Sequence, residues 1–192
     1  LLRTAIAALV TAVPACAIAR QAPAPMDTAT CGAVAAAIDS LVIGSRDQRV
    51  GLRDVTQPRR EVAESQLREA LARMPEIDGA TLRSFRENNA RPMPSCASLP
   101  LVGGTTRLTQ EDLAVLPTSD PLRYWNAFKA RYPGVAGVTQ VSGVGMGRGG
   151  RQALLMLDHR CGGRCGAGHI VLLERDDEGK WRVTRAVMTW IS

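Results

Sequence analysis

The amino-acid sequence predicts an α+β fold, with N-terminal helices packed on a C-terminal antiparallel β-meander of four to five strands. As far as residue 133, apolar residues recur at the spacing of helices. Beyond Gly134 they alternate with polar residues in four consecutive segments, joined by short links that contain glycine. Such links favour hairpins over the long crossovers of a parallel sheet. We expect a single domain over residues 30–192, with its helical part at about 30–133 and the β-meander at about 134–192.

The first 19 residues have the three parts of a secretory signal peptide. Arg3 forms a short basic n-region. Ala5–Val13 forms the apolar h-region, which is too short to cross a bilayer as a permanent helix. Ala17-Ile18-Ala19 then places small residues where a signal peptidase cuts, which predicts cleavage before Arg20. Residues 20–29, with two prolines, are expected to form a flexible leader. We therefore expect a periplasmic or secreted protein.

A second interpretation makes the protein a membrane-anchored lipoprotein. Val13-Pro14-Ala15-Cys16 approximates the motif that directs lipidation, with Cys16 as the modified N-terminus. Pro14 fits that motif poorly, which favours the soluble exported form. Contact with a membrane is expected only if Cys16 is lipidated.

The cysteines indicate a protein held together by disulfides. Cleavage before Arg20 leaves Cys31, Cys96, Cys161 and Cys165, an even number that suits two disulfides in an oxidising compartment. Four cysteines allow three pairings. The short separation of Cys161 from Cys165 favours a bridge between these two, which leaves Cys31 to pair with Cys96.

Five helices are expected before residue 133. Three of them have capping signals at the N-terminus: Thr30 before the first, Thr109 with Asp112 as a capping box, and Asp120 before the last. The expected helices are Cys31–Ser40, Arg59–Met74, a helix from Asp78 or Gly79 to near Asn88-Asn89, a helix that begins after Thr109, and one from Asp120 to Arg131.

The expected strands lie mostly after Gly134. Leu41-Val42-Ile43 is a short apolar run that could form a first strand, and Arg107-Leu108 ends another. The four strands of the meander are expected at Val138–Val144, Ala153–Leu157, His169–Arg175 and Trp181–Ile191.

The aromatic side chains are few, and most are expected to pack in the core. The last helix should present Leu122, Trp125 and Phe128 to the interior. Trp181 and Trp190 also suit sheet packing, with the alternative that they line an exposed groove for an apolar or peptide ligand.

The C-terminal half carries an ordered set of short motifs: Tyr132-Pro133-Gly134, Ser142-Gly143-Val144-Gly145, Ala153-Leu154-Leu155, Cys161-Gly162-Gly163-Arg164-Cys165-Gly166, Leu172-Leu173-Glu174 and Gly179-Lys180-Trp181. In these motifs the chain resembles an uncharacterised family of exported bacterial proteins with a YPG…SxVG…AL…CGxxCG…LLEK…DGKW pattern. The resemblance covers roughly Leu82 to Ser192, with Phe85 and Asn88-Asn89 matching an earlier helix. It implies an exported α+β protein and no particular activity or ligand.

The charge distribution gives little support to nucleic-acid binding. The formal net charge is +6, but Lys and Arg are scattered, and the densest cluster is only Arg59-Arg60. A basic stripe interleaved with aromatic residues, the usual signature of such binding, is missing from the sequence. The expected partner is an unknown envelope protein or a small ligand.

The segment His159–His169, which we call the cysteine turn, has an alternative interpretation as a metal site. His159, Cys161, Cys165 and His169 offer two imidazoles and two thiolates within eleven residues, a ligand set that suits zinc or copper(I). His159 and Cys161 are two apart on an expected strand, so their side chains share a face. The leading expectation remains a disulfide between Cys161 and Cys165 and no cofactor, because oxidation of the thiols would abolish the metal site.

Catalytic motifs are weak. Ser142 lacks the following helix of a nucleophile elbow, and the glycines at 143–150 lack the Gly-Lys-Ser/Thr and helix of a phosphate loop. Asp158 and His159 are adjacent on an expected strand, so they should point to opposite faces. We expect an exported, non-enzymatic binding or interaction protein that is stabilised by disulfides.

Overall fold

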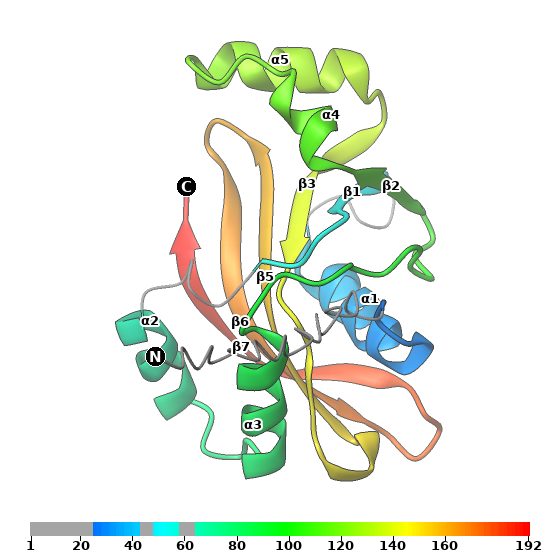
Figure 1. Ribbon diagram of the computed structural model, residues 1–192, viewed down its shortest axis with the longest axis vertical. Helices are drawn as coiled ribbons and strands as arrows, with labels where there is room; N and C mark the ends of the chain where they lie inside the picture. Colours follow the sequence, from blue (N-terminus) through cyan, green and yellow to red (C-terminus); the bar gives the residue numbers. More distant parts are fainter. Residues whose placement is uncertain (1–24, 43–47, 58–63) are drawn as a thin grey trace, which may run out of the picture.

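The computed structural model describes residues 25–42, 48–57 and 64–192. The expected signal peptide at 1–19 and most of the expected leader at 20–29 therefore lie outside the described residues. None of the described helices is both long and apolar enough to cross a membrane. The elements, in chain order, are α1 (Thr28–Leu41), β1 (Arg49–Arg53), α2 (Glu64–Ala72), α3 (Gly79–Asn88), β2 (Thr105–Leu108), α4 (Gln110–Ala114), α5 (Pro121–Arg131), β3 (Val135–Val141), β4 (Gly145–Met146), the 3-10 turn η2 (Arg148–Gly150), β5 (Gln152–Gly162), β6 (Cys165–Arg175) and β7 (Trp181–Ile191) (Figure 1).

In the described part of the chain, seven strands form one mixed sheet in the order β2-β1-β3-β5-β6-β7, and β4 pairs with β5 beside this path. β3, β5, β6 and β7 are antiparallel neighbours, which confirms the α+β class and the antiparallel C-terminal strands. The simple meander is wrong, because β1 and β2 join the same sheet as parallel strands. The sequence pattern does not predict β1, whereas β2 ends at Arg107-Leu108, where the end of a strand is predicted.

The sequence pattern misses β1 because this strand lies inside the sheet, between β2 and β3. Val50, Gly51 and Leu52 are all buried, so the strand lacks the alternation of a half-exposed strand. Gly51 has no room for a side chain, since Gly137 of β3 and Leu108 of β2 lie against it. A segment of polar sequence thus forms an interior strand of the sheet, because it pairs with strands that are distant in the sequence.

α1 begins earlier and ends later than the predicted helix Cys31–Ser40. Asp27 is its N-cap and accepts a hydrogen bond from the backbone N–H of Thr30 at 2.7 Å, so the cap is not Thr30. Leu41 is the last helical residue, and Ile43 lies outside the described residues. The strand predicted at Leu41–Ile43 is therefore wrong in its described part, because Leu41 continues the apolar face of the helix.

Three helices begin where the sequence pattern predicts. Asp78 caps α3, Thr109 and Asp112 form the reciprocal capping box of α4, and Asp120 caps α5. α2 lies within the predicted helix Arg59–Met74, of which residues 59–63 are outside the described residues.

α5 buries Trp125 and Phe128 as predicted, whereas Leu122 is 69% exposed. The prediction for Leu122 is wrong because it is six positions before Phe128, which places the two side chains about 120° apart around a helix.

The C-terminal strands differ from the prediction mainly in their ends. β5 and β6 both continue to the cysteine turn, well beyond the predicted ends at Leu157 and His169. The segment predicted as one strand at Val138–Val144 contains the end of β3 and a bend before β4. β7 has the predicted bounds.

Helices cover both faces of the sheet. α1 packs on one face, against the side chains of Leu155, Leu157, Val171 and Leu173. α2 and α3 pack on the other face, against Leu154, Met156, Ile170 and Leu172. α4 and α5 cover the same face near β1, β2 and β3, and in Figure 1 they lie at the opposite end of the sheet from α2 and α3.

α3 lies close against the backbone between β3 and β5. Gly143 and Gly145 leave no room for a Cβ, because Asn88 and Phe85 of α3 press directly on them. The buried side chain of Asn89 donates to the carbonyl oxygen of Gly143 at 2.7 Å and accepts from its N–H at 2.8 Å. These glycines therefore serve close packing of a helix on backbone.

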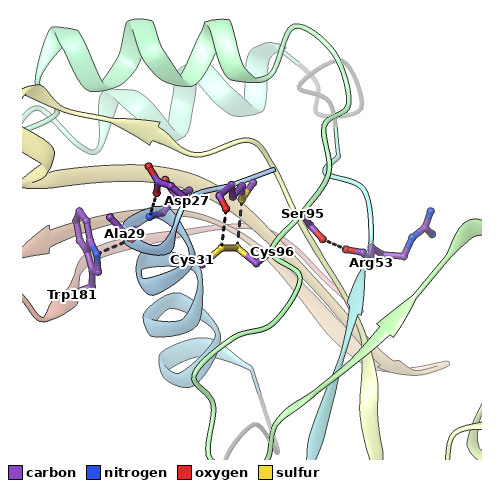
Figure 2. Close-up of a disulfide and its surroundings, with 9 residues drawn as sticks. Asp27, Ala29, Cys31, Arg53, Ser95, Cys96 and Trp181 are labelled. Atoms are coloured by element: carbon purple, nitrogen blue, oxygen red, sulfur yellow. Dashed lines mark hydrogen bonds between the residues drawn. A yellow bond between two sulfur atoms is a disulfide. The ribbon is translucent and has the colours of Figure 1, made fainter. Parts of the chain in front are cut away.

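The structure contains both expected disulfides, Cys31–Cys96 and Cys161–Cys165. Figure 2 shows the first, which joins α1 to the segment before β2. Beside Cys96, Ser95 donates its hydroxyl to the carbonyl oxygen of Arg53 at 2.5 Å. The bridge thus anchors the segment that holds the end of β1.

Candidate functional site

A cavity of about 710 Å³ lies on the face of the sheet that carries α2–α5. Its floor comes from β1, β3, β5 and β7, and one wall comes from α4, α5 and the segment that joins them. The floor includes Arg53, Val138, Gln140, Asp158, Arg160 and Trp190, and the wall includes Leu113, Thr118, Pro121, Tyr124 and Trp125. This volume is in the range of small-molecule sites in proteins.

A partly buried carboxyl group lies in the floor of the cavity. The Oδ1 atom of Asp158 accepts a hydrogen bond from the indole N–H of Trp190 at 3.0 Å. Burial raises the pKa of Asp158 above its ordinary value, while hydrogen bonds from Trp190 and Gln57 and the charge of Arg160 oppose that shift. The hydrogen bonds thus hold the carboxyl group in place, and the neighbouring groups offset only part of the cost of its desolvation.

Two glycines of the cysteine turn make this hydrogen bond possible. Register pairs Asp158 with Gly168 and Gly168 with Trp190, so the three residues stand side by side on β5, β6 and β7. A Cβ on Gly168 would collide with both the indole nitrogen of Trp190 and the carboxylate of Asp158. A Cβ on Gly166 would meet the same indole ring at 3.0 Å. The ring therefore lies across β6 on a glycine surface.

Arg160 completes this part of the floor. Its guanidinium carbon lies 5.1 Å from the ring centre of Trp190, a cation–π distance. Arg160 and Asp158 are two apart on β5, so both side chains face the cavity. Trp190 therefore contacts a cation with its face and a carboxylate with its edge.

A second guanidinium comes from the end of β1. Arg53 donates from Nη2 to Oε1 of Gln110 at 2.5 Å, and its buried Nε atom has no hydrogen-bond partner among the described residues. Burial raises the pKa of the nearby Tyr124 hydroxyl, and the charges of Arg53 and Arg160 partly oppose this shift. Both guanidinium groups therefore lie close enough to Tyr124 to influence its hydroxyl group.

Trp190 is a candidate ligand-binding residue in the sequence pattern, but its partners in the cavity are not. Trp190 lines the cavity, whereas Trp181 packs against α1 on the other face and donates its indole N–H to the carbonyl oxygen of Ala29 at 3.1 Å (Figure 2). The two tryptophans therefore do not form one groove. The spacing of Gly166 and Gly168, which places both on one face of a strand, was the available signal for a flat side chain above them.

The four candidate metal ligands come together on the face opposite Asp158. His159, Cys161, Cys165 and His169 line a second cavity of about 280 Å³, in which the two sulfur atoms are bonded to each other. Within residues 25–42, 48–57 and 64–192, no group of three or more His, Cys, Asp or Glu side chains is arranged to hold a metal ion.

His159 is a buried neutral side chain. Its Nδ1 atom lies 2.9 Å from the hydroxyl oxygen of Thr139, and Nε2 has no partner among the described residues. Burial lowers the pKa of His159 to about 4. Burial also lowers the pKa of His169, and the charge of Asp158 opposes that shift.

Ser142 has a structural role. Its hydroxyl is buried, donates to the carbonyl oxygen of Gly143 at 2.9 Å and accepts from the backbone N–H of Met156 at 2.8 Å. Asp158 and His159 line different cavities on opposite faces of the sheet, so they do not form a pair.

The site thus belongs to an α+β protein with a polar and aromatic cavity on one face of a mixed sheet. Comparison of the chain with protein-family models, with curated proteins and with solved structures found no match.

Proposed function

We propose that the protein is an exported, non-enzymatic binding protein of the bacterial envelope, and that its ligand occupies the cavity beneath α5. The observation that carries this proposal is the pair formed by Asp158 and Trp190 in the cavity floor. Partial burial of a carboxyl group costs stability unless neighbouring groups compensate it. The position of this group in a cavity of ligand size supports contact with a ligand.

Binding fits the cavity better than catalysis does. Among the described residues that line it, Asp158 has no histidine beside it, because His159 faces the second cavity. Ser142 uses its hydroxyl to bond backbone groups. The groups that do line the cavity, two guanidiniums, two amides and aromatic rings, are those that orient and hold a bound molecule.

Two features support export. Both disulfides are of the kind that persists in an oxidising compartment. The N-terminal residues have the pattern of a signal peptide, with cleavage before Arg20. A disulfide-bonded binding protein of the periplasm is consistent with both.

The experiment is a ligand screen on protein purified from the periplasm with both disulfides formed. Amino acids, organic acids, amines and sugars are titrated while the indole N–H resonance of Trp190 is followed by NMR. Thr118→Phe places a ring at the exposed rim of the cavity, and Ser119→Phe is the matched control at an exposed neighbour that does not line it.

We expect at least one probe to shift the Trp190 resonance saturably, with weaker binding in Thr118→Phe than in Ser119→Phe. Binding that leaves Trp190 unperturbed, or that Thr118→Phe does not weaken, would place the ligand elsewhere and overturn the proposal. A screen in which nothing binds would overturn it as well.

A further inference from the structure

The charged groups that line the cavity do not balance. Arg53 and Arg160 are its two cationic side chains, and Asp158 is its one carboxylate side chain among the described lining residues. The side chains that line the cavity therefore carry an excess of positive charge.

Neither guanidinium is neutralised by direct contact with a carboxylate of the described residues. The hydrogen-bonded partner of Arg53 is the neutral amide of Gln110, and its Nε atom has no partner there. Arg160 stacks on Trp190, and its influence on Asp158 is through charge at longer range. Arg53 is partly buried, so without an anion its guanidinium retains part of its desolvation cost, which an anionic ligand would offset.

The planar fork of a guanidinium matches the two oxygen atoms of a carboxylate. On the helical side, the cavity is lined mainly by aromatic and apolar side chains, among them Tyr124, Trp125 and Leu113. Such walls favour a flat apolar body over a strongly hydrated one. Inorganic phosphate or a sugar phosphate would leave these walls without a partner.

We propose that the ligand is a small carboxylic acid with a planar apolar body, whose carboxylate binds between Arg53 and Arg160 while its body packs on Trp125 and Trp190. This inference rests on the proposed function, since it names the class of molecule for the same cavity. Gln140 also lines the cavity and can bind polar substituents of the ligand. Asp158, already engaged by Trp190, selects against a second anionic group near the floor.

Three matched probes test the class of ligand: phenylacetate, phenylacetamide and phenethylamine share one ring and differ in charge. With about ten non-hydrogen atoms, a probe of this size is expected to bind with a millimolar Kd. Phenylacetate should shift the Trp190 indole resonance. The amide and the amine should bind at least about tenfold more weakly than phenylacetate, since they lack its charge-assisted hydrogen bonds.

Arg53→Gln and Arg160→Gln should each weaken phenylacetate binding about tenfold. Arg148→Gln, an exposed position in η2 away from the cavity, removes the same charge and should leave the affinity unchanged. Arg160 is exposed, so its replacement keeps the test valid even if Arg53→Gln impairs folding.

Equal binding of phenylacetate and phenylacetamide, or tighter binding of phenethylamine, would overturn the carboxylate inference and leave the cavity as a ligand site. Displacement of phenylacetate by lower concentrations of inorganic phosphate would also overturn it. Loss of binding in Arg148→Gln as large as that in Arg160→Gln would show a general charge effect and contradict the site. Failure of phenylacetate to perturb Trp190 would exclude this class of ligand, while the wider screen still decides the proposed function.

Discussion

The indole N–H of Trp190 donates to Oδ1 of Asp158 at 3.0 Å, across a strand residue that has no side chain. Gly168 stands between the two, and a Cβ there would collide with both. Three residues on three adjacent strands therefore form one unit, in which the glycine is as necessary as the donor and the acceptor.

Replacing Gly168 with alanine should displace the ring of Trp190 from Asp158. Overpacking of this kind costs about 1–3 kcal/mol, so we expect a loss of unfolding free energy of that size in urea denaturation. The Trp190 indole resonance should move toward the position of an indole in water.

Gly163→Ala is the control for this change, since Gly163 lies in the exposed turn with ordinary contact distances around it. It should leave the Trp190 resonance in place. The packing account fails if both variants have the stability of the parent protein.

The Asp158 carboxyl should make stability depend on pH. Its pKa is raised in the folded protein, so the folded state binds the proton more tightly than the unfolded state does. Ionisation of this carboxyl group therefore lowers the stability of the folded protein. The loss grows as the pH rises from about 3.8, the pKa of the group in the unfolded chain, through its higher pKa in the folded protein.

Asp158→Asn removes this titration and keeps an oxygen that can accept from Trp190. We expect the variant to gain stability relative to the parent protein as the pH rises through that window, measured by urea denaturation at a series of pH values. Asp27, Asp112 and Asp176, whose pKa values are lowered, are common to both proteins and cancel in the difference. A difference that does not vary with pH would contradict this prediction.

The two disulfides should contribute unequally to stability. Cys31–Cys96 joins residues 65 apart, and Cys161–Cys165 joins residues 4 apart. The chain-entropy estimate is about 4 kcal/mol for the long loop and about 2 kcal/mol for the short one.

Removal of each pair by double alanine substitution tests this order through the free energy of unfolding in urea. The long-range pair should cost more. Equal losses, or a larger loss for the hairpin pair, would show that packing around the sulfur atoms outweighs loop entropy.

Export predicts the number of free thiols. Protein purified from the periplasm should begin at Arg20 and show no reactive thiol after denaturation without reductant, because its four cysteines form two disulfides. Retention of the leader would add one thiol, from Cys16. Two reactive thiols that zinc(II) or copper(I) protects would instead support a metal site at the cysteine turn.

Local signals made several elements predictable from the sequence. Thr109 with Asp112, and Asp120, mark helix starts because the capping hydrogen bonds join residues two or three apart. β7 is predictable in its full length because it lies at the edge of the sheet, where its side chains alternate between partly buried and exposed along much of the strand. The misplaced elements depend on distant partners: β1 pairs with β2 and β3, which are more than fifty residues away along the chain.

The candidate site was less predictable than the fold. Trp190 was singled out, but its partners Asp158 and Arg160 lie thirty residues earlier, and Arg53 lies on a strand that the sequence pattern does not predict. The contact of Trp190 with Asp158 also depends on β6 passing between them, with a glycine at the point of crossing.

The sequence by itself determined the α+β class, the capped helices and the long C-terminal strands, and its cysteine spacing favoured the disulfide pairing that the structure contains. These features follow from periodicity and from interactions between near neighbours in the chain. Only the tertiary structure decided that the sheet is mixed, that Trp181 and Trp190 lie on opposite faces, and that two arginines and one partly buried aspartate line the same cavity. The physical reason is that strand register, which sets the face of every side chain, is fixed by pairing between segments far apart in the sequence.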